Sequence, residues 1–315
     1  MFISPTRSLI GAARRIRKGG IIVNEHTLSR SQTRFHVEIL SRSFDFIHHD
    51  ELFDRLNKPR ARPFCLLTFD DGKRSNATEV APELGRLGVP AVFYVVTRCI
   101  SDGTPNLFDS YKVLTDTLGH APQGLEPDIV KLLPYELFSE RLERACTKHR
   151  VAPDMTDDNV RSMSWDEVRH LSSRGFTIGA HTLRHVILTC EQDSVALEEL
   201  EKSMAEVTTE LRSPCATFAF TNGNYNARLA KHAVKCGAKT VMTTEPLWAD
   251  SRSSSWRLPR IQLFEGQSTS KIELKIALAA AGKVLADPNG DGRLYQRINR
   301  LNRQQNQVQA RQTEN

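Results

Sequence analysis

A strand–helix–strand unit most constrains the fold of this chain, and it spans about thirty residues, as such units do. The apolar run at residues 64–67 predicts a buried strand, and residues 77–87 predict a helix with Val80, Leu84 and Leu87 on one face. Gly88 ends that helix, and residues 91–96 are again apolar and predict the next strand. Strands connected through a helix run parallel, so the unit predicts an α/β fold.

Two adjacent carboxylates stand where the first of these strands ends. Asp70 and Asp71 follow it directly, and Gly72 comes next. In parallel α/β folds the carboxyl ends of strands are where catalytic groups gather. Neighbouring side chains of a strand point to opposite sides, so one carboxylate can hold a metal while the other handles a proton. Taken alone, an Asp-Asp-Gly sequence is more typical of a turn.

A pair of histidines follows a second short strand in the same manner. Residues 176–180 predict the strand, and His181 and His185 lie four positions apart just after it. That spacing predicts both imidazoles on one side of a single helical turn. Two histidines and a carboxylate, with one position left for water, form the ligand set of a catalytic zinc site. An isolated pair of this kind is more typical of surface or core positions, and the shared placement at strand ends favours the metal site.

These motifs resemble those of a known enzyme family. Residues 68–72 and 181–185 are similar to the first two motifs of the polysaccharide deacetylases with NodB homology, carbohydrate esterase family four. Residues 218–225 resemble the third motif in a branch where it reads Phe-Ala-Tyr-Pro, with Thr221 here in place of the usual proline. The resemblance covers residues 64–263 and implies an α/β fold, a distorted (β/α) barrel of about seven parallel strands.

The resemblance also implies a reaction and a set of roles. Asp71, His181 and His185 would ligate Zn²⁺ or another divalent metal, and Asp70 would act as the general base. The backbone amide of Asn222 would help to hold the oxyanion. The implied activity is metal-dependent hydrolysis of the N-acetyl group of an acetamido sugar, in a polysaccharide or glycoconjugate of a cell-surface pathway.

The sequence departs from the family in two ways. Ala219 stands where members commonly carry an arginine that orients the base, and no histidine lies near the last barrel strand to protonate the leaving amine. Our hypothesis is that Arg260 replaces the missing arginine and pairs with Asp70. The proton donor stays unassigned. His26 ends a predicted strand and could line the site, as a histidine at this place does in many relatives, although we prefer a structural role for it.

Two other functions are consistent with the same residues. One is deformylation or deacetylation of a lipid-linked or nucleotide-linked sugar at the same site. The other is a catalytically weakened barrel that binds a glycan or a partner protein. The intact Asp70 favours an enzyme, whereas the unassigned proton donor favours the binding barrel.

The chain divides into three predicted parts. Residues 1–60 form an N-terminal extension with a leading strand and helices, 61–295 the deacetylase barrel, and 296–315 a disordered tail with few apolar residues. A helical insertion at 97–162 leaves the barrel between the two motifs, as lids and substrate walls do. Phe108, Tyr111 and Tyr135 are its candidates for stacking on a sugar, although packing within the insertion is the commoner role of such residues.

Composition and charge limit the partners. A hydrophobic content of 39% and a net charge of +6 describe an ordinary globular protein, and no basic motif indicates nucleic-acid binding. The first twenty residues do not form a signal peptide, no stretch is long enough for a transmembrane helix, and the six cysteines form no CxxC pair. We therefore expect a cytoplasmic location, with peripheral membrane association as an alternative. The expected partner is the acetylated sugar, and the sequence does not determine the oligomeric state.

Overall fold

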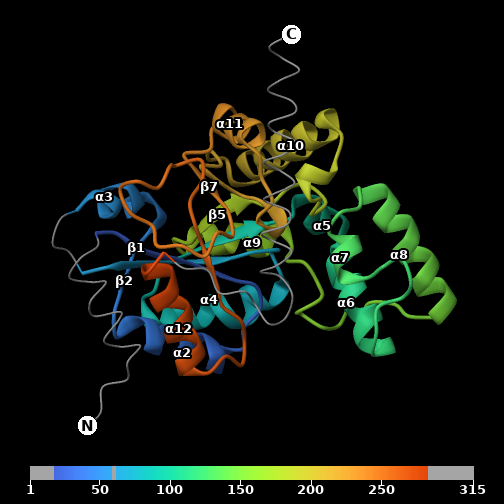
Figure 1. Cartoon of the computed structure of the whole chain (residues 1–315), viewed down its shortest axis with the longest axis horizontal. Coiled ribbons are helices and arrows are strands. Elements are labelled where there is room, and N and C mark those ends of the chain that lie inside the picture. The colour runs from blue at the N-terminus through green and yellow to red at the C-terminus, as the bar shows by residue number, and fades with distance from the viewer. Residues whose placement is uncertain (1–17, 59–61, 283–315) are drawn as a thin grey trace.

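Parallel strands form one curled sheet in the computed structural model, which describes residues 18–58 and 62–282 (Figure 1). The predicted tail at 296–315 lies outside these residues. The strands are β1 (Gly20–Glu25), β2 (Asp45–Phe46), β3 (Phe64–Phe69), β4 (Ala91–Val95), β5 (Thr177–Ala180), β6 (Thr217–Ala219), β7 (Thr240–Met242) and β8 (Ile261–Gln262). Seven of them follow the order β7-β6-β5-β4-β3-β1-β8, and β2 pairs with the start of β3.

The sheet curls toward closure at its two outer strands. A parallel bridge between Met242 in β7 and Leu258, just before β8, joins the two ends of the strand order. Every pairing between named strands is parallel. The predicted fold class, a distorted (β/α) barrel of about seven parallel strands, is confirmed.

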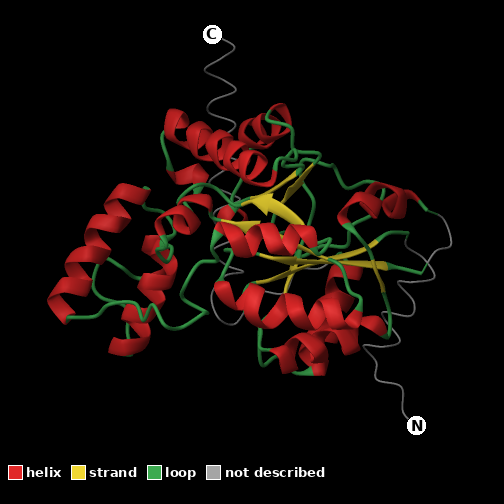
Figure 2. Ribbon diagram, turned by 180° about the vertical axis from the view of Figure 1, so that it is seen from behind, coloured by secondary structure: helices red, strands yellow, loops and turns green. Residues whose placement is uncertain are grey.

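Helices cover the outside of the sheet, as the view from behind also shows (Figure 2). The α-helices of the described residues are α2 (Arg30–Ser41), α3 (Leu52–Asn57), α4 (Ala81–Leu87), α5 (Thr97–Asp102), α6 (Leu107–Leu118), α7 (Pro127–Val130), α8 (Tyr135–His149), α9 (Trp165–Ser173), α10 (Asp193–Leu211), α11 (Ala227–Lys235) and α12 (Thr269–Ala280). Of these, α6, α7 and α8 belong to the insertion. The predicted capping box at the start of α9 is present, because the Ser164 hydroxyl and the Glu167 carboxylate each accept a backbone N–H of the other residue. None of the described helices is both long and apolar enough to span a membrane.

Alternation along the strands separates two hydrophobic cores. Residues of one parity pack outward against the helices: Ile21, Val23, Cys65, Leu67, Phe93 and Val95. Residues of the other parity fill the inside of the barrel: Ile22, Phe64, Leu66, Val92, Tyr94, Ala219 and Met242. Because both faces of a parallel sheet are covered, both sets are apolar, and the parity of a residue decides which core it joins.

The N-terminal segment contributes to this barrel. β1 lies within the residues 1–60 that the sequence analysis sets apart as an extension, yet it pairs with β3 along its whole length, from Gly20 opposite Phe64 to Glu25 opposite Phe69. It also pairs with β8 on its other side. β1 is therefore an interior strand of the same sheet.

The insertion has a small core of its own. Its helices α6, α7 and α8 lie to one side of the sheet, in green in Figure 1. They enclose a separate apolar cluster made of Leu114, Leu125, Val130, Phe138 and Leu142. The insertion thus packs around its own side chains.

Candidate active site

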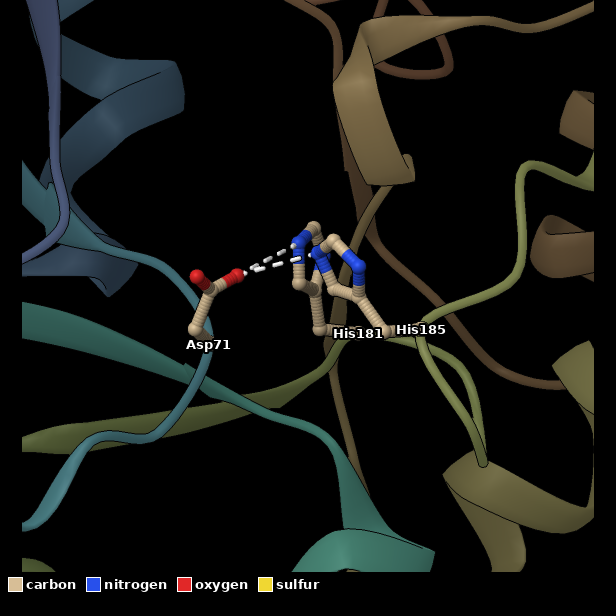
Figure 3. A group of neighbouring side chains, drawn as sticks. All are labelled: Asp71, His181 and His185. Carbon is tan, nitrogen blue, oxygen red and sulfur yellow. Dashed lines mark ion pairs between the residues drawn. The ribbon is translucent and has the colours of Figure 1, made fainter. Parts of the chain in front are cut away.

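Three side chains from two strand ends converge at one edge of the barrel (Figure 3). Asp71 follows β3, and His181 and His185 follow β5. The Nε2 atom of His185 lies 3.0 Å from Asp71 Oδ1, and the Nε2 atom of His181 lies 3.6 Å from the same oxygen. The structure therefore brings together the three residues that the sequence analysis selects as metal ligands.

The protonation of His181 suits a metal ligand. Its Nδ1 lies 2.8 Å from the carbonyl oxygen of Ala219, which can only accept, so Nδ1 carries the hydrogen. Burial disfavours the imidazolium and lowers the pKa of His181 to about 4, although the charges of Asp70 and Asp71 act in the opposite direction. At neutral pH the ring is neutral, and the lone pair of Nε2 faces Asp71. A hydrogen bond of this kind on the far nitrogen is a usual support of metal-bound histidine.

Two buried polar atoms of this group lack hydrogen-bond partners among the described residues. They are Asp71 Oδ1 and His185 Nδ1. Burial raises the pKa of Asp71, but the charges of His185, His26 and Lys73 outweigh it and hold that pKa well below its ordinary value. A buried, ionised oxygen without a well-directed donor is costly unless a cation satisfies it. With one carboxylate oxygen and two imidazole nitrogens, the residues present fit a divalent metal such as zinc.

Asp70 faces the inside of the barrel and is held by Arg260. The guanidinium Nη1 and Nη2 atoms donate to Asp70 Oδ1 at 2.7 Å and Oδ2 at 2.8 Å, so both carboxylate oxygens are engaged. Arg260 is completely buried. Burial raises the pKa of Asp70, yet the charges of Arg260 and His181 outweigh it, and the pKa lies below its ordinary value. The pair that we hypothesised from the sequence is present in the structure.

A polar layer inside the barrel positions this arginine. Arg260 Nη1 also contacts Thr68 Oγ1 at 3.1 Å, and its Nε donates to the Thr243 carbonyl at 2.9 Å. The Tyr94 ring lies 5.5 Å from the guanidinium carbon. Thr68 shares the inward parity of Leu66 and Asp70, so alternation along β3 leads from the apolar interior to these polar groups. Thr68 and Tyr94 did not stand out in the sequence, although their parity marks them as inward-facing.

The loops that carry the ligands have unusual backbone geometry. Asp71 and Gly72 both have positive φ, at 73° and 65°. A Cβ on residue 72 would make a tight contact, 3.2 Å from Val95, so the positive φ and the closeness of this residue both favour glycine. Thr182 and His185 also have positive φ, at 65° and 63°. The prediction of a single helical turn between the histidines is wrong, because left-handed residues at both positions bring the imidazoles together through a bent loop instead.

Glu199 of α10 holds the histidine loop in this shape. Its Oε2 accepts the backbone N–H groups of Leu183 and Arg184, each at 3.0 Å, and its Oε1 accepts Arg184 Nε at 2.7 Å. Glu199 is only 1% exposed. Hydrogen bonds to a buried carboxylate offset the cost of a strained loop. The sequence analysis missed Glu199, because a glutamate in a helix fifteen residues away carries no local signal of this contact.

The third motif lies beside the histidine loop. The Thr221 hydroxyl donates to the carbonyl of Val186, so the residue that replaces the usual proline ties the two loops together. Asn222 follows with a left-handed backbone, φ 52°, and its side-chain amide donates to Asn224 Oδ1 at 2.8 Å. Asn222 therefore lies in a bent turn after β6, at the same edge of the sheet as β5.

His26 lies at the same edge, directly after β1. β1 and β3 pair in register, so His26 follows Glu25 as Asp70 follows Phe69. When protonated, its charge helps to lower the pKa values of Asp70 and Asp71 against the raising effect of burial. His26 is partly exposed, whereas the other groups around Asp70 are buried. Of the two alternatives for His26, this proximity favours a position that lines the site.

The insertion contacts both ligand loops. The Phe108 ring packs edge-on against His185 with centroids 5.5 Å apart, and Arg184 lies 4.4 Å over the Tyr135 ring. From the other loop, the buried ammonium of Lys73 pairs with Asp109 of α6. A small apolar pocket beside His185 is lined by residues of the insertion and of the histidine loop, among them Phe108, Tyr135, Val186 and Ile187.

The third aromatic candidate of the insertion lies elsewhere. Tyr111 packs edge-on against Phe138, with ring centroids 6.0 Å apart, inside the core of the insertion. Phe108 and Tyr135 thus approach the candidate site, and Tyr111 has the packing role that is commoner for such residues.

Comparison with known protein families gives a match to this chain. The sequence profile described as polysaccharide deacetylase matches residues 57–241, more than half of the 315-residue chain. No curated protein sequence matches the chain.

Several solved structures share the fold. The deacetylase PplD of Streptococcus pyogenes is 15% identical with a TM-score of 0.58, covering 82% of this chain and 97% of its own. IcaB of Ammonifex degensii is 15% identical with a TM-score of 0.57, covering 84% and 97%. The BpsB deacetylase domain of Bordetella bronchiseptica is 17% identical with a TM-score of 0.53, covering 78% and 96%. At these identities the similarity is one of fold.

Proposed function

The chain belongs to the polysaccharide deacetylase family, and on that premise we propose that it hydrolyses the N-acetyl group of an acetamido sugar in a polysaccharide or glycoconjugate. One observation carries this proposal. Asp71, His181 and His185 converge on a common point, and the adjacent Asp70 is held separately, by both carboxylate oxygens, on Arg260. One carboxylate is thus available to a metal and the next to a proton, which is the division of labour that metal-assisted hydrolysis requires.

Asp71, His181 and His185 would hold the metal, and zinc suits this nitrogen-rich set. When bound, such an ion polarises the carbonyl of the acetamide and lowers the pKa of a water to about 7. His181 enters this role as a neutral ligand, because burial holds its pKa at about 4 and Ala219 accepts the hydrogen of its other nitrogen.

Asp70 would take the proton of the attacking water. Its pKa lies below the ordinary value, because the charges of Arg260 and His181 outweigh burial, so the carboxylate is ionised at neutral pH. Arg260 would orient this base, since two parallel hydrogen bonds fix the plane of the carboxylate. This assigns to Arg260 the positioning role that other family members give to an arginine in the third motif.

Two further groups would complete the reaction. The backbone N–H of Asn222, in the turn after β6, would donate to the oxyanion as charge develops on the carbonyl oxygen. His26 would donate the proton that the leaving amine needs, because it lies at the same sheet edge and is close enough to influence both carboxylates. The amine then leaves as a free amino sugar, and the acetyl group leaves as acetate.

The insertion would form one wall of the substrate site. Phe108 touches a ligand ring and Tyr135 lies beneath Arg184, so both aromatic side chains are placed next to the reaction centre. Since the ligands fix only the type of reaction, the identity of the sugar chain would depend on such surrounding surfaces. The ordered Asp70–Arg260 pair favours an enzyme over a barrel that only binds glycans.

Release of acetate from a panel of acetylated oligosaccharides tests the proposal. We expect release by the zinc-loaded protein, loss of release with a chelator, and recovery when zinc is restored. Formylated and nucleotide-linked sugars in the same panel separate the alternative substrates. A zinc-loaded protein that binds oligosaccharides yet releases no acyl group from any of them would contradict the proposal and identify a binding barrel.

A further inference from the structure

A second group of metal-ligating side chains lies on the outside of the molecule, away from the carboxyl ends of the strands. It consists of Glu201 in α10 and of His232 and Cys236 at the end of α11, and we call it the outer cluster. Among the described residues, it is the one other group besides Asp71, His181 and His185 whose histidine, cysteine and carboxylate donors come this close together.

The donor atoms of the outer cluster are close enough for one ion. All three lie within 4.8 Å of one another, and His232 Nε2 is 2.5 Å from Glu201 Oε1. Bonds from zinc to sulfur, nitrogen and oxygen are about 2.0–2.3 Å long, so the ligand atoms of one tetrahedral ion lie roughly 3.3–3.7 Å apart. The contact between His232 and Glu201 is a hydrogen bond that the ion would replace. Small rotations of side chains that are not fully buried would place the three donors around a common centre.

The helices supply this arrangement by their geometry. His232 and Cys236 are four positions apart, which places both on one face of α11, and the Cys236 N–H donates to the His232 carbonyl at 3.0 Å. α10 and α11 lie side by side at the top of Figure 1, and Arg228 of α11 pairs with Asp193 of α10. Glu201 therefore faces α11 as part of an established helix–helix contact.

The chemistry of the three donors differs from that of an ordinary ion pair. Glu201 and His232 alone would be a hydrogen-bonded pair on the surface. The thiol of Cys236 adds a soft donor at the same place. A cation bound there favours the thiolate. Zinc accepts sulfur, nitrogen and oxygen ligands together.

We propose that Glu201, His232 and Cys236 form a second zinc site, which joins α10 to α11. The ligands are Glu201 Oε1, His232 Nε2 and Cys236 Sγ, and water completes the coordination. As the sulfur–zinc bond forms, the thiol proton is released to solvent. The hydrogen that His232 Nε2 donates to Glu201 also leaves this nitrogen, so that its lone pair can bind the ion. The site lies on the outer helices and takes no part in hydrolysis, so it does not depend on the proposed function.

Cobalt(II) tests the site, because only a thiolate ligand produces a sulfur-to-cobalt charge-transfer band in the near ultraviolet. The candidate active site holds no sulfur among its three donors, so its occupation cannot give this band. With reduced full-length protein we expect the band to reach the intensity of one thiolate-bound cobalt per chain, after up to about two equivalents, because the candidate active site also takes one ion. Cys236→Ser should abolish it, whereas His181→Ala should leave it unchanged.

Matched variants sharpen the assignment. Cys146→Ser removes another partly buried thiol, whose pKa is raised by burial, and should leave the band intact. His232→Ala and Glu201→Gln should each weaken cobalt binding about tenfold or more, since even outer-sphere partners of a ligand are worth about 10–100-fold in affinity. The absence of the band in the wild-type protein, its persistence in Cys236→Ser or its loss in Cys146→Ser would each overturn the proposal. Acetate release should be the same in Cys236→Ser and the wild type, so failure of this site and failure of the proposed function can be distinguished.

Discussion

Two groups of three donor side chains, one at the barrel edge and one on the outer helices, differ in how the chain holds them. Asp71, His181 and His185 follow strands, and two of the three have left-handed backbones. His232 lies within a regular helix and Cys236 ends it, with Glu201 exposed on the neighbouring helix. Neighbouring residues fix the inner group through buried hydrogen bonds, whereas helical spacing along α11 and the packing of α10 beside it place the outer one.

The difference shows what preorganisation adds to a donor set. At the barrel edge the Ala219 carbonyl fixes one imidazole and Glu199 fixes the loop, so the ligands cannot turn toward solvent. In the outer cluster the donor side chains have more freedom to rotate, because Glu201 is exposed and the other two are partly exposed. We therefore expect loss of an inner donor to affect activity strongly, and loss of an outer donor to affect only local stability.

Removal of one ligand from each group should show the largest contrast. His181→Ala should lose both the active-site metal and acetate release, because one carboxylate and one imidazole rarely retain a metal. His232→Ala should leave acetate release unchanged. Metal content and initial rates measure both effects. Full activity in His181→Ala would contradict the assignment of the inner group as the metal site.

The two adjacent carboxylates divide the inner site into separable roles. Asp70→Asn should keep the metal while kcat falls by about 10²–10⁴, the contribution typical of a general base. Asp71→Asn should lose the metal as well as activity. Parallel measurements of metal content and kcat test this. If Asp70→Asn instead loses the metal and Asp71→Asn keeps it, the roles are exchanged.

Arg260 should control the pH range in which Asp70 works. Burial raises the pKa of Asp70 and the Arg260 charge lowers it, so Arg260→Ala should raise that pKa. Because the base must be ionised, the acidic limb of the kcat/KM profile should move to higher pH, and activity at low pH should fall. Arg260→Lys keeps a charge and should shift the limb less. An unchanged limb in Arg260→Ala would exclude this positioning role, and circular dichroism would establish that the variant is folded.

Loss of the hydrogen bonds that Glu199 accepts should have a smaller effect on metal binding by the inner group. Glu199→Gln replaces one of the two carboxylate oxygens that accept hydrogen bonds from Leu183 and Arg184, in the loop between the histidines. Because this loop positions the ligands, metal affinity should fall about 10–100-fold. Glu198→Gln is the matched control, since Glu198 precedes Glu199 in α10 but is exposed and pairs with Lys202 on the helix surface. A zinc titration against a competing chelator measures both. Equal zinc affinities of Glu199→Gln and the wild type would show that the loop keeps its shape without these hydrogen bonds.

Removal of Phe108, which packs against His185, should have the smallest effect on metal binding. Phe108→Ala removes the ring that packs on His185, so we expect a higher KM for an oligosaccharide and an unchanged metal content. Tyr111→Phe, in the same helix but directed into the core of the insertion, should behave as the wild type. A KM that Phe108→Ala does not change would place substrate selection on other loops.

Much of this architecture could be predicted from local patterns. Apolar strands separated by amphipathic helices predicted a parallel α/β fold, and placement at strand ends predicted which residues meet. The resemblance to the polysaccharide deacetylases implied the barrel. It also led to the pairing of Arg260 with Asp70, because the third motif lacks the arginine that family members commonly carry.

The tertiary structure decided the shape of the site. The histidines converge through a loop in which Thr182 and His185 have left-handed backbones. The four-residue spacing of the histidines had wrongly predicted a helical turn there. That loop is held by Glu199, and the insertion reaches the site through Lys73 and Asp109. Such contacts join residues far apart in the chain, and their energies depend on burial and on the direction of each hydrogen bond. Local sequence determines which elements form, whereas these long-range bonds determine how their ends are bent, because only the packed fold brings donor and acceptor together.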